Sequence, residues 1–554
     1  MIQRDPLEAG KSERAIDRVL SGLKKEYVLV GKTRVKAWHA WLLVGIAAGV
    51  AAGIILVANR SGELEPGKAA SAKRPNIVVI LMDDMRLDDL WVMKNVNALI
   101  ANDGGISFSN FFVSNSICCP SRATFMTGKY SHNHGVMTNV PGYAGLDDHR
   151  NTLGVWLQNA GYYTGYIGKY MNGYGIDDAD EVPGAPPYEV APGWNDWHAI
   201  QSTNSEYFYY TMTEMTNNGP VAVNTYGTTT ADDPNIYITD VMTDKAVDFI
   251  NSRAADATPF FLMVGEKSPH FEFTESRDEE DDNLDILQSF TANNPPAAPR
   301  DEGKFAEAPL AVSPSFNEKD VSDKPIAVRL FPLMRGKELA AVKDFYRNRW
   351  ESMISVDDGV ARIMEALRRA GKLDSTIIIF TSDNGFMLGE HRIPLGKGLL
   401  YEESSHLPFI MKIPGMSGSR TIDKLVANVD IAPTILEIAG GSPCATINDV
   451  STCREMDGRS FLALSKKKIT TWRTALLLES PAYSAVRTND YAYGVYSTGE
   501  KELYNFTDNA CHRADPYELE SQHKNSCYQT NGTMNELQRL LDALKTCSGA
   551  VCWQ

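Results

Sequence analysis

The chain has 554 residues, 43% of them hydrophobic, and a formal net charge of −16 at pH 7. This length and apolar content predict one large buried core with room for a smaller second domain. Because a phosphate polymer would be repelled by the negative charge, we expect no nucleic-acid partner, and any anionic ligand needs a locally basic pocket.

The first predicted element is the uncharged apolar run "WLLVGIAAGVAAGIILVA" at 41–58. A helix of this length is about long enough to cross the hydrocarbon core of a bilayer. Lys32, Arg34 and Lys36 precede this run, whereas Arg60, Glu63 and Glu65 follow it. The positive-inside rule therefore predicts a cytosolic tail at 1–40. We therefore expect a type II single-pass membrane protein with a transmembrane signal-anchor helix, a stalk at 59–74, and the rest in the secretory lumen or outside the cell. The alternative is a buried helix of a soluble protein.

Four apolar runs rich in β-branched or aromatic residues each end in polar groups. They predict buried strands at 76–84, 163–170, 260–270 and 375–385. Nearly continuous apolar strands are typical of a sheet covered on both faces, so we expect an α/β domain at 75–440 with a large, mostly parallel sheet flanked by helices. Ligands of such sheets bind beyond the carboxyl ends of the strands, where these runs place acids, lysines and a histidine.

Helical periodicity is clearest at 345–371, where Gly371 is expected to end the helix. From about residue 440 the sequence changes to short alternating stretches and a final amphipathic helix near 534–546. This pattern predicts a smaller C-terminal α+β domain at 441–554, with a short antiparallel sheet and disulfides.

Six of the eight cysteines lie in the C-terminal part, at Cys444, Cys453, Cys511, Cys527, Cys547 and Cys552. Disulfides persist in oxidising compartments, and nearest-neighbour pairing is the simplest of the connectivities open to six cysteines. Asn505 and Asn531 begin Asn-x-Thr sequons, which predict glycosylation. Cys118 and Cys119 remain, and adjacent cysteines rarely bridge each other because the disulfide geometry strains so short a loop.

Cys118 lies in "NSICCPSRATFMTGKYSHNHG" at 115–135. Pro120 and Ser121 suit the first turn of a helix, so Cys118 is expected just ahead of a helix N-terminus, where backbone N–H groups favour an anion. Arg122 adds a guanidinium group, whose positive charge and paired N–H donors suit an oxyanion. A thiolate nucleophile fits this setting, but it conflicts with an oxidising lumen and an adjacent thiol.

The stretch "CCPSRATFMTG" resembles the sulfatase signature Cys-x-Pro-Ser-Arg followed by Thr-Gly. Other family elements follow in order: the pair Asp83 and Asp84, Gly168 with Lys169, Pro269 with His270, "SDNG" at 382–385, and "GKGLLYEES" with Lys397. The C-terminal "ELYNFTDNACHRADPYEL" resembles the closing element of the family. "PGWNDWHAIQSTNSEYFYYTM", "GKYSHNHGV" and "VANVDIAPTILEIAGG" are most similar to the N-acetylglucosamine-6-sulfatase and extracellular endosulfatase branch.

The resemblance implies an alkaline-phosphatase-like sulfatase fold and hydrolysis of a sulfate ester, with a carbohydrate such as a 6-O-sulfated hexosamine as the expected substrate. It implies that a formylglycine-generating enzyme oxidises Cys118 to formylglycine. One hydroxyl of the hydrated aldehyde then attacks sulfur, and the other allows sulfate to leave.

The expected metal ligands are Asp83, Asp84, Asp383 and Asn384, together with the modified Cys118. An oxygen-only set suits Ca²⁺ or Mg²⁺ rather than Zn²⁺, and the resemblance favours Ca²⁺. Either acidic pair taken alone is more often a turn or loop cap.

The resemblance assigns the sulfate oxygens to Arg122, Lys169 and Lys397. His270 is expected to protonate the leaving oxygen or to bind sulfate. Many sulfatases carry Lys-x-His where this chain has Lys169 followed by Tyr-Met-Asn, so Asn172 is expected to replace that histidine as a neutral hydrogen-bond donor.

Three rival functions remain open. The nearest is a phosphomonoester or phosphodiester hydrolase of the same superfamily. A catalytically silent, membrane-tethered binding protein would keep Cys118 unmodified. A cysteine hydrolase would be inactivated by thiol alkylation and would be indifferent to metal chelation.

Overall fold

The computed structural model describes residues 74–175, 190–228, 233–272, 294–310, 313–447, 450–467, 471–506 and 531–553. The predicted tail, signal-anchor helix and stalk lie outside these residues. Within the described ranges, no helix combines the length and the apolar character that crossing a bilayer requires.

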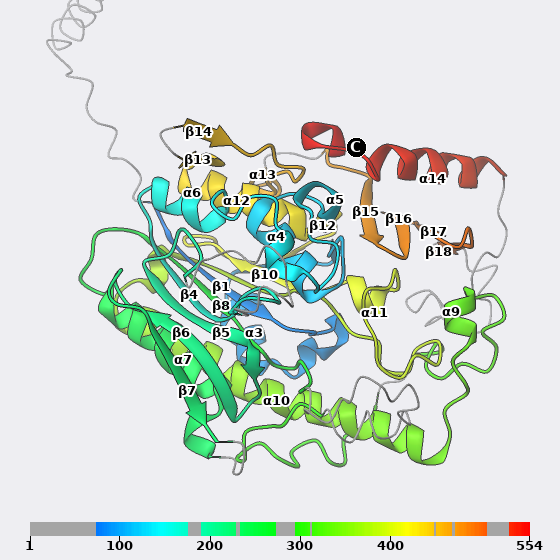
Figure 1. Cartoon of the computed structure of the whole chain (residues 1–554), viewed down its shortest axis with the longest axis horizontal. Coiled ribbons are helices and arrows are strands. Elements are labelled where there is room, and N and C mark those ends of the chain that lie inside the picture. Colours follow the sequence, from blue (N-terminus) through cyan, green and yellow to red (C-terminus); the bar gives the residue numbers. More distant parts are fainter. Residues whose placement is uncertain are drawn as a thin grey trace, which may run out of the picture. The chain divides into compact units, whose positions relative to one another are not determined.

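A sheet of ten strands forms the centre of the molecule (Figure 1). In spatial order its strands are β11 (Arg420–Ile422), β2 (Gly105–Phe108), β10 (Phe409–Lys412), β9 (Thr376–Ser382), β1 (Asn76–Met82), β8 (Phe260–Gly265), β4 (Tyr163–Lys169), β5 (Asp196–Ser205), β6 (Tyr209–Met215) and β7 (Ala222–Gly227). The five strands from β9 to β5 run parallel, and β10, β6 and β7 join antiparallel. The expected mostly parallel α/β sheet is thus confirmed, with all four predicted strands in its middle.

The continuous apolar sequence of β1 reflects burial on both faces of the sheet. Ile77, Val79 and Leu81 belong to one hydrophobic cluster, whereas Val78 and Ile80 belong to another. All five are at most 1% exposed. Because successive side chains of a strand point to opposite faces, only a strand covered on both sides needs apolar residues at every position.

Helices supply the two covering layers (Figure 1). The long helices α7 (Ile238–Ser252) and α10 (Gly336–Arg369) lie on one face, and α4 (Cys118–Thr127), α6 (Leu153–Asn159) and α12 (Ile431–Ala439) lie on the other. Several further α-helices are short: α3 (Lys94–Val96), α5 (Ser131–His134), α9 (Ile326–Arg329), α11 (Glu402–Ser405) and α13 (Leu462–Ser465).

Helix α10 begins nine residues before the predicted start. The Glu338 carboxylate accepts a hydrogen bond from the Arg335 backbone N–H at 3.1 Å and so caps its first turn. Most side chains of this first stretch are exposed, so it lacks the apolar periodicity that identified the rest of the helix. Gly371 follows the helix with φ +65°, the left-handed conformation that glycine adopts readily.

The C-terminal region contains the expected short antiparallel sheet. Its strands are β15 (Ala475–Ser480), β16 (Tyr483–Thr488), β17 (Tyr491–Tyr496) and β18 (Lys501–Asn505), and helix α14 (Asn531–Leu544) packs against β15 and β16. Two small sheets pair β3 (Phe111–Phe112) with β12 (Val426–Ala427), and β13 (Cys444–Ile447) with β14 (Val450–Cys453). Phe461 and Trp472 belong to the hydrophobic cluster of the central sheet, so the segment after residue 440 continues the same core.

Nearest-neighbour pairing holds for both disulfides among the described residues, Cys444–Cys453 and Cys547–Cys552. The third expected pair, Cys511 with Cys527, lies outside the described residues. Cys118 and Cys119 are free and buried, as expected.

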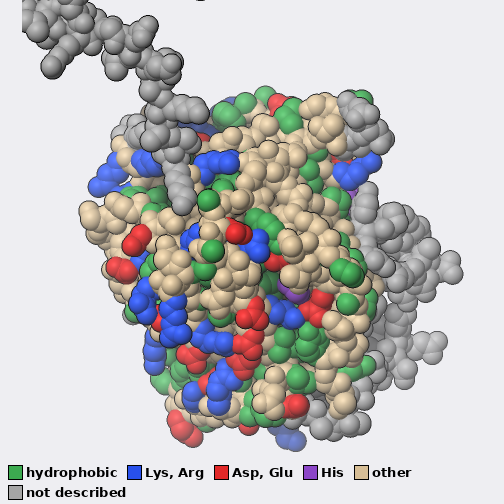
Figure 2. Space-filling view, turned by 90° about the vertical axis from the view of Figure 1, so that its left-hand side faces the viewer, with side chains coloured by type: hydrophobic (Ala, Val, Ile, Leu, Met, Phe, Trp, Pro, Cys, Tyr) green, Lys and Arg blue, Asp and Glu red, His purple; other side chains and the backbone are tan. Residues whose placement is uncertain are grey.

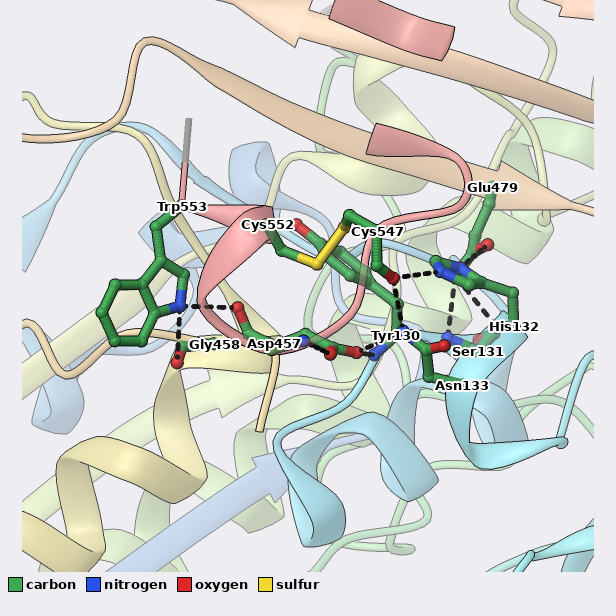
Figure 3. Close-up of a disulfide and its surroundings, with 11 residues drawn as sticks. Tyr130, Ser131, His132, Asn133, Asp457, Gly458, Glu479, Cys547, Cys552 and Trp553 are labelled. Carbon is green, nitrogen blue, oxygen red and sulfur yellow. Dashed lines mark hydrogen bonds and ion pairs between the residues drawn. A yellow bond between two sulfur atoms is a disulfide. The ribbon is translucent and has the colours of Figure 1, made fainter. Parts of the chain in front are cut away.

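Hydrogen bonds link the loop closed by the Cys547–Cys552 disulfide to helix α5 (Figure 3). His132 of α5 bonds the Glu479 carboxylate through Nδ1 at 2.8 Å and the Cys547 carbonyl through Nε2 at 3.0 Å. The Asp457 carboxylate accepts hydrogen bonds from two backbone N–H groups, each at 2.7 Å. One belongs to Tyr130, just before α5, and the other to Gly549, in the disulfide loop. Helix α5 follows α4 in the chain and packs against it, and α4 begins with Cys118. These contacts therefore stabilise the position of the helix that carries Cys118.

Basic and acidic side chains lie side by side on the face shown in Figure 2. The exposed charge of this face is therefore mixed in sign.

Candidate active site

The parallel register brings distant motifs to one edge of the sheet. Strands β9, β1, β8 and β4 are neighbours, and their carboxyl ends meet there. Asp83 and Asp84 follow β1, Asp383 and Asn384 follow β9, Lys267 and His270 follow β8, and Lys169 ends β4. The predicted site residues from these four strands are therefore assembled by strand order.

Cys118 is the first residue of α4 instead of preceding the helix, with Pro120 and Ser121 in the first turn as predicted. Its Sγ lies 3.5 Å from Asp83 Oδ1 and accepts a hydrogen bond from Lys397 Nζ at 2.7 Å. Burial, reinforced by the charge of Asp83, raises the pKa of the Cys118 thiol to about 12 despite two nearby lysines. The unmodified side chain is thus a neutral thiol, which is unsuited to the thiolate chemistry of a cysteine hydrolase.

The donor atoms beside Cys118 fit a hard cation. One ligand atom each from Asp83, Asp84, Cys118 and His270 lie within 4.8 Å of one another. Asp84 Oδ2 and Asn384 Oδ1 are buried and accept no hydrogen bond from any described residue. Buried oxygens are normally satisfied, so these two have lone pairs available for a metal ion.

Asp383 borders this cluster and organises it. Its Oδ1 accepts from the Asp84 N–H at 3.2 Å and the Asn384 N–H at 2.7 Å, and its Oδ2 accepts from Arg122 Nε at 2.7 Å. Asn384 Nδ2 in turn donates to Asp84 Oδ1 at 2.5 Å. The two pairs predicted as metal ligands, Asp83 with Asp84 and Asp383 with Asn384, are therefore joined by direct hydrogen bonds.

The site charges control the ionisation of these carboxyls. Burial opposes the charge on Asp83, but Lys169 and its cationic neighbours hold the pKa of Asp83 well below its usual range. Burial likewise opposes the charge on Asp84, and Lys397 is the main reason that the pKa of Asp84 is lowered. Both carboxylates are therefore ionised at neutral pH, as ligands of a divalent cation must be.

Three cationic side chains surround the same point. Lys169 Nζ pairs with Asp83, and Lys397 Nζ lies 2.5 Å from Asp84 Oδ1. Arg122 donates from Nε to Asp383 and from Nη1 to the carbonyls of Lys169 and Tyr170. Its Nη2 has no hydrogen-bond partner among the described residues. The predicted sulfate-binding residues thus lie together beside Cys118.

His270 is held as a neutral imidazole. Nδ1 lies 2.7 Å from the Phe271 carbonyl, a geometry that assigns the ring proton to Nδ1, and Nε2 lies 3.8 Å from Asp84 Oδ2. Burial lowers the pKa of His270 to about 3. Nε2 therefore offers a lone pair towards the cluster in this state.

A pocket of about 100 Å³ opens beside Lys169 and His270. Its polar lining includes the predicted Asn172 and three residues that the sequence analysis did not select, Gln201, Ser202 and Lys267. Lys267 lies three residues before His270 and follows the same buried strand. This position after a buried strand could have identified it as a candidate site residue. Gln201 and Ser202 lie on β5 and reach the pocket only because β5 pairs with β4.

Comparison with known proteins agrees with this geometry. The sulfatase family model matches residues 75–442, and a model described as the C-terminal part of N-sulphoglucosamine sulphohydrolase matches residues 389–546. N-acetylglucosamine-6-sulfatase of Capra hircus is 29% identical over 88% of this chain and 86% of its own length. The Homo sapiens protein of the same name is 31% identical over 74% of this chain and 68% of its own length.

Among solved structures, that of BT4656 in complex with D-glucosamine-2-N,6-O-disulfate has a TM-score of 0.64. The two proteins are 24% identical, and the match covers 85% of this chain and 97% of the other. The two proteins therefore share the same fold. The match of the family model to most of the sequence shows that this chain belongs to the sulfatase family of sulfuric ester hydrolases.

Proposed function

We propose that this protein hydrolyses a sulfate ester of a carbohydrate, such as a 6-O-sulfated hexosamine, with formylglycine formed from Cys118. The observation that carries the proposal is the position of Cys118, which touches both the Asp83 carboxylate and the Lys397 ammonium. The two relatives named as N-acetylglucosamine-6-sulfatases support the choice of a 6-sulfated amino sugar.

Asp83, Asp84, Asp383 and Asn384 are proposed to hold a divalent cation next to residue 118, with Ca²⁺ as the first candidate and Mg²⁺ as the second. A cation held there would lower the pKa of a hydroxyl of the hydrated formylglycine, which would favour its ionisation to a nucleophile at neutral pH. The chain contributes a buried site in which the Asp83 and Asp84 carboxylates stay ionised.

Lys169, Lys397 and Arg122 are proposed to hold the sulfate oxygens. Charge builds up on these oxygens and on the leaving alcohol during attack, so cations fixed in a buried site stabilise the transition state more than water does. Asn172 and His270 line the same pocket as Lys169 and are proposed to bind the substrate. A negatively charged sulfate ester next to His270 raises its pKa, which favours proton donation to the leaving oxygen.

The proposed setting is the secretory lumen or the cell exterior, with 41–58 as the type II signal anchor. Two disulfides support an oxidising compartment, in which a formylglycine-generating enzyme would act on Cys118. Asn505 ends β18 and Asn531 begins α14, and both are proposed to carry N-glycans.

A peptide mass measurement and a matched pair of variants test the proposal. In protein from the secretory pathway, the peptide containing residue 118 should have the mass of an aldehyde in place of a thiol. Cys118→Ala should abolish hydrolysis of N-acetylglucosamine 6-sulfate, whereas Cys119→Ser, at the adjacent buried thiol, should keep most of it. An unmodified Cys118 in active protein, or activity confined to phosphate esters, contradicts the proposal.

A further inference from the structure

The pocket beside the proposed sulfate site contains a third lysine, to which the proposed reaction assigns no role. Lys267 follows β8, lines the pocket with Lys169 and His270, and is only 6% exposed. A lysine this buried is unusual unless its charge is paired.

The charge of Lys267 is not compensated in the way that the charges of the other two site lysines are. Lys169 and Lys397 pair with carboxylates of the proposed metal site. Among the residues that the structure describes, no side chain forms an ion pair or hydrogen bond with Lys267 Nζ, which lies 5.2 Å from the centre of the Tyr207 ring. The ring holds the ammonium at the pocket and leaves its three donors available.

The pKa of Lys267 indicates that burial disfavours its charged form. Burial and the nearby charge of Lys169 lower the pKa of Lys267 to about 8, although Glu272, Asp83 and Glu206 favour its charged form. A buried ammonium in this condition gains much from an anionic partner that also accepts its hydrogen bonds. In a chain of net charge −16, a buried ammonium with no ion-pair partner among the described residues points to an anionic ligand.

Polar side chains of a neighbouring strand line the same pocket as Lys267. Gln201 and Ser202 of β5 line it, and Gln201 is held in place by donating to Thr213 Oγ1 at 3.0 Å. An amide and a hydroxyl that line one pocket with an ammonium are donors suited to sulfate or carboxylate oxygens. The sulfate ester to be cleaved belongs at Lys397, which contacts Cys118, so these side chains face another part of the substrate.

On the basis of the proposed function, we propose that Lys267, with Gln201 and Ser202, binds a second anionic group of the substrate. The preferred substrate would then be a sulfated sugar with a further sulfate or carboxylate near the ester that is cleaved. Lys267 would act in substrate specificity, whereas Lys169 and Lys397 act on the reacting sulfate.

Kinetics with three substrates test this inference. They are N-acetylglucosamine 6-sulfate, N-sulfoglucosamine 6-sulfate, and a 6-sulfated glucosamine joined to a uronate. Wild-type protein should have the higher kcat/KM for at least one substrate with a second anionic group. Lys267→Met should raise KM for that substrate about tenfold or more, and change the values for N-acetylglucosamine 6-sulfate little. Lys267→Arg should restore most of the preference, and Lys412→Met, a lysine of β10 outside the pocket, should behave as wild type.

The outcomes separate this inference from the proposed function. A preference for the N-sulfated substrate identifies sulfate as the second group, and one for the uronate identifies carboxylate. If Lys267→Met lowers kcat for all three substrates equally, the residue acts on the reacting sulfate and the inference is wrong. It is also wrong if wild-type protein does not distinguish the three. If wild-type protein cleaves none of them, the proposed function itself fails.

Discussion

Lys397 donates a hydrogen bond to the Cys118 sulfur at 2.7 Å, although 279 positions separate the two residues in the chain. The same ammonium lies 2.5 Å from Asp84 Oδ1. One lysine therefore contacts both the residue proposed as the source of the nucleophile and a carboxylate proposed as a metal ligand. This relationship places a fixed positive charge next to the proposed nucleophile.

Replacing Lys397 should mainly slow the chemical step. We expect Lys397→Met to lower kcat by about 100- to 1,000-fold, because one preorganised donor to the developing charge is lost. Steady-state kinetics with N-acetylglucosamine 6-sulfate measure the effect, and Lys412→Met is the control. A kcat within a factor of about two of wild type would remove Lys397 from the catalytic residues.

A divalent cation should stabilise the folded protein. Asp83 and Asp84 are adjacent, buried and ionised, so a bound cation relieves their repulsion. At a Ca²⁺ concentration 100 times its Kd, we expect the free energy of unfolding to rise by about 2.7 kcal/mol. Chelation should reverse this and abolish activity.

The variant Asp84→Asn tests where the cation binds, and thermal unfolding with and without Ca²⁺ is the measurement. This variant should lose most of the Ca²⁺-dependent rise in Tm, whereas Asp423→Asn, an exposed acid, should keep it. Equal rises in both variants would mean that Ca²⁺ stabilises the protein from another place.

The two histidines of α5 should affect stability with opposite pH dependence. The hydrogen bond to Glu479 raises the pKa of His132, although burial opposes this, so its stabilising contribution is present at acidic pH and is lost as pH rises through the raised pKa. We expect His132→Gln to lower the free energy of unfolding by about 1–2 kcal/mol at pH 5 and by less at pH 8.

His134 is the matched control for this prediction. Burial lowers the pKa of His134 to about 3, so its contribution is present above the unfolded-state pKa and decreases as pH falls. His134→Gln should therefore cost more stability at pH 8 than at pH 5. Urea unfolding at the two pH values measures both variants. The same pH trend in both would contradict the stabilising role given to the His132–Glu479 contact in Figure 3.

The strands illustrate how far sequence patterns reach. Continuous apolar runs identified β1, β4, β8 and β9, because a strand covered on both faces must be apolar at every position. The first turns of α10 were missed, because exposed helical residues have no apolar period to detect. Which runs are neighbours was not visible in any pattern, since it depends on long-range pairing such as that of β1 with β9.

The amino-acid sequence by itself determined the chemical groups of the site, because the Cys-x-Pro-Ser-Arg stretch, the two acidic pairs, and the lysines and histidine that follow strands are local motifs. Only the tertiary structure decided which of these groups touch. It also added Lys267, Gln201 and Ser202, from β8 and β5, to the pocket of Lys169. The physical reason is that hydrogen bonding, burial and pKa depend on distances across the sheet, and strand order sets those distances for residues far apart in the chain.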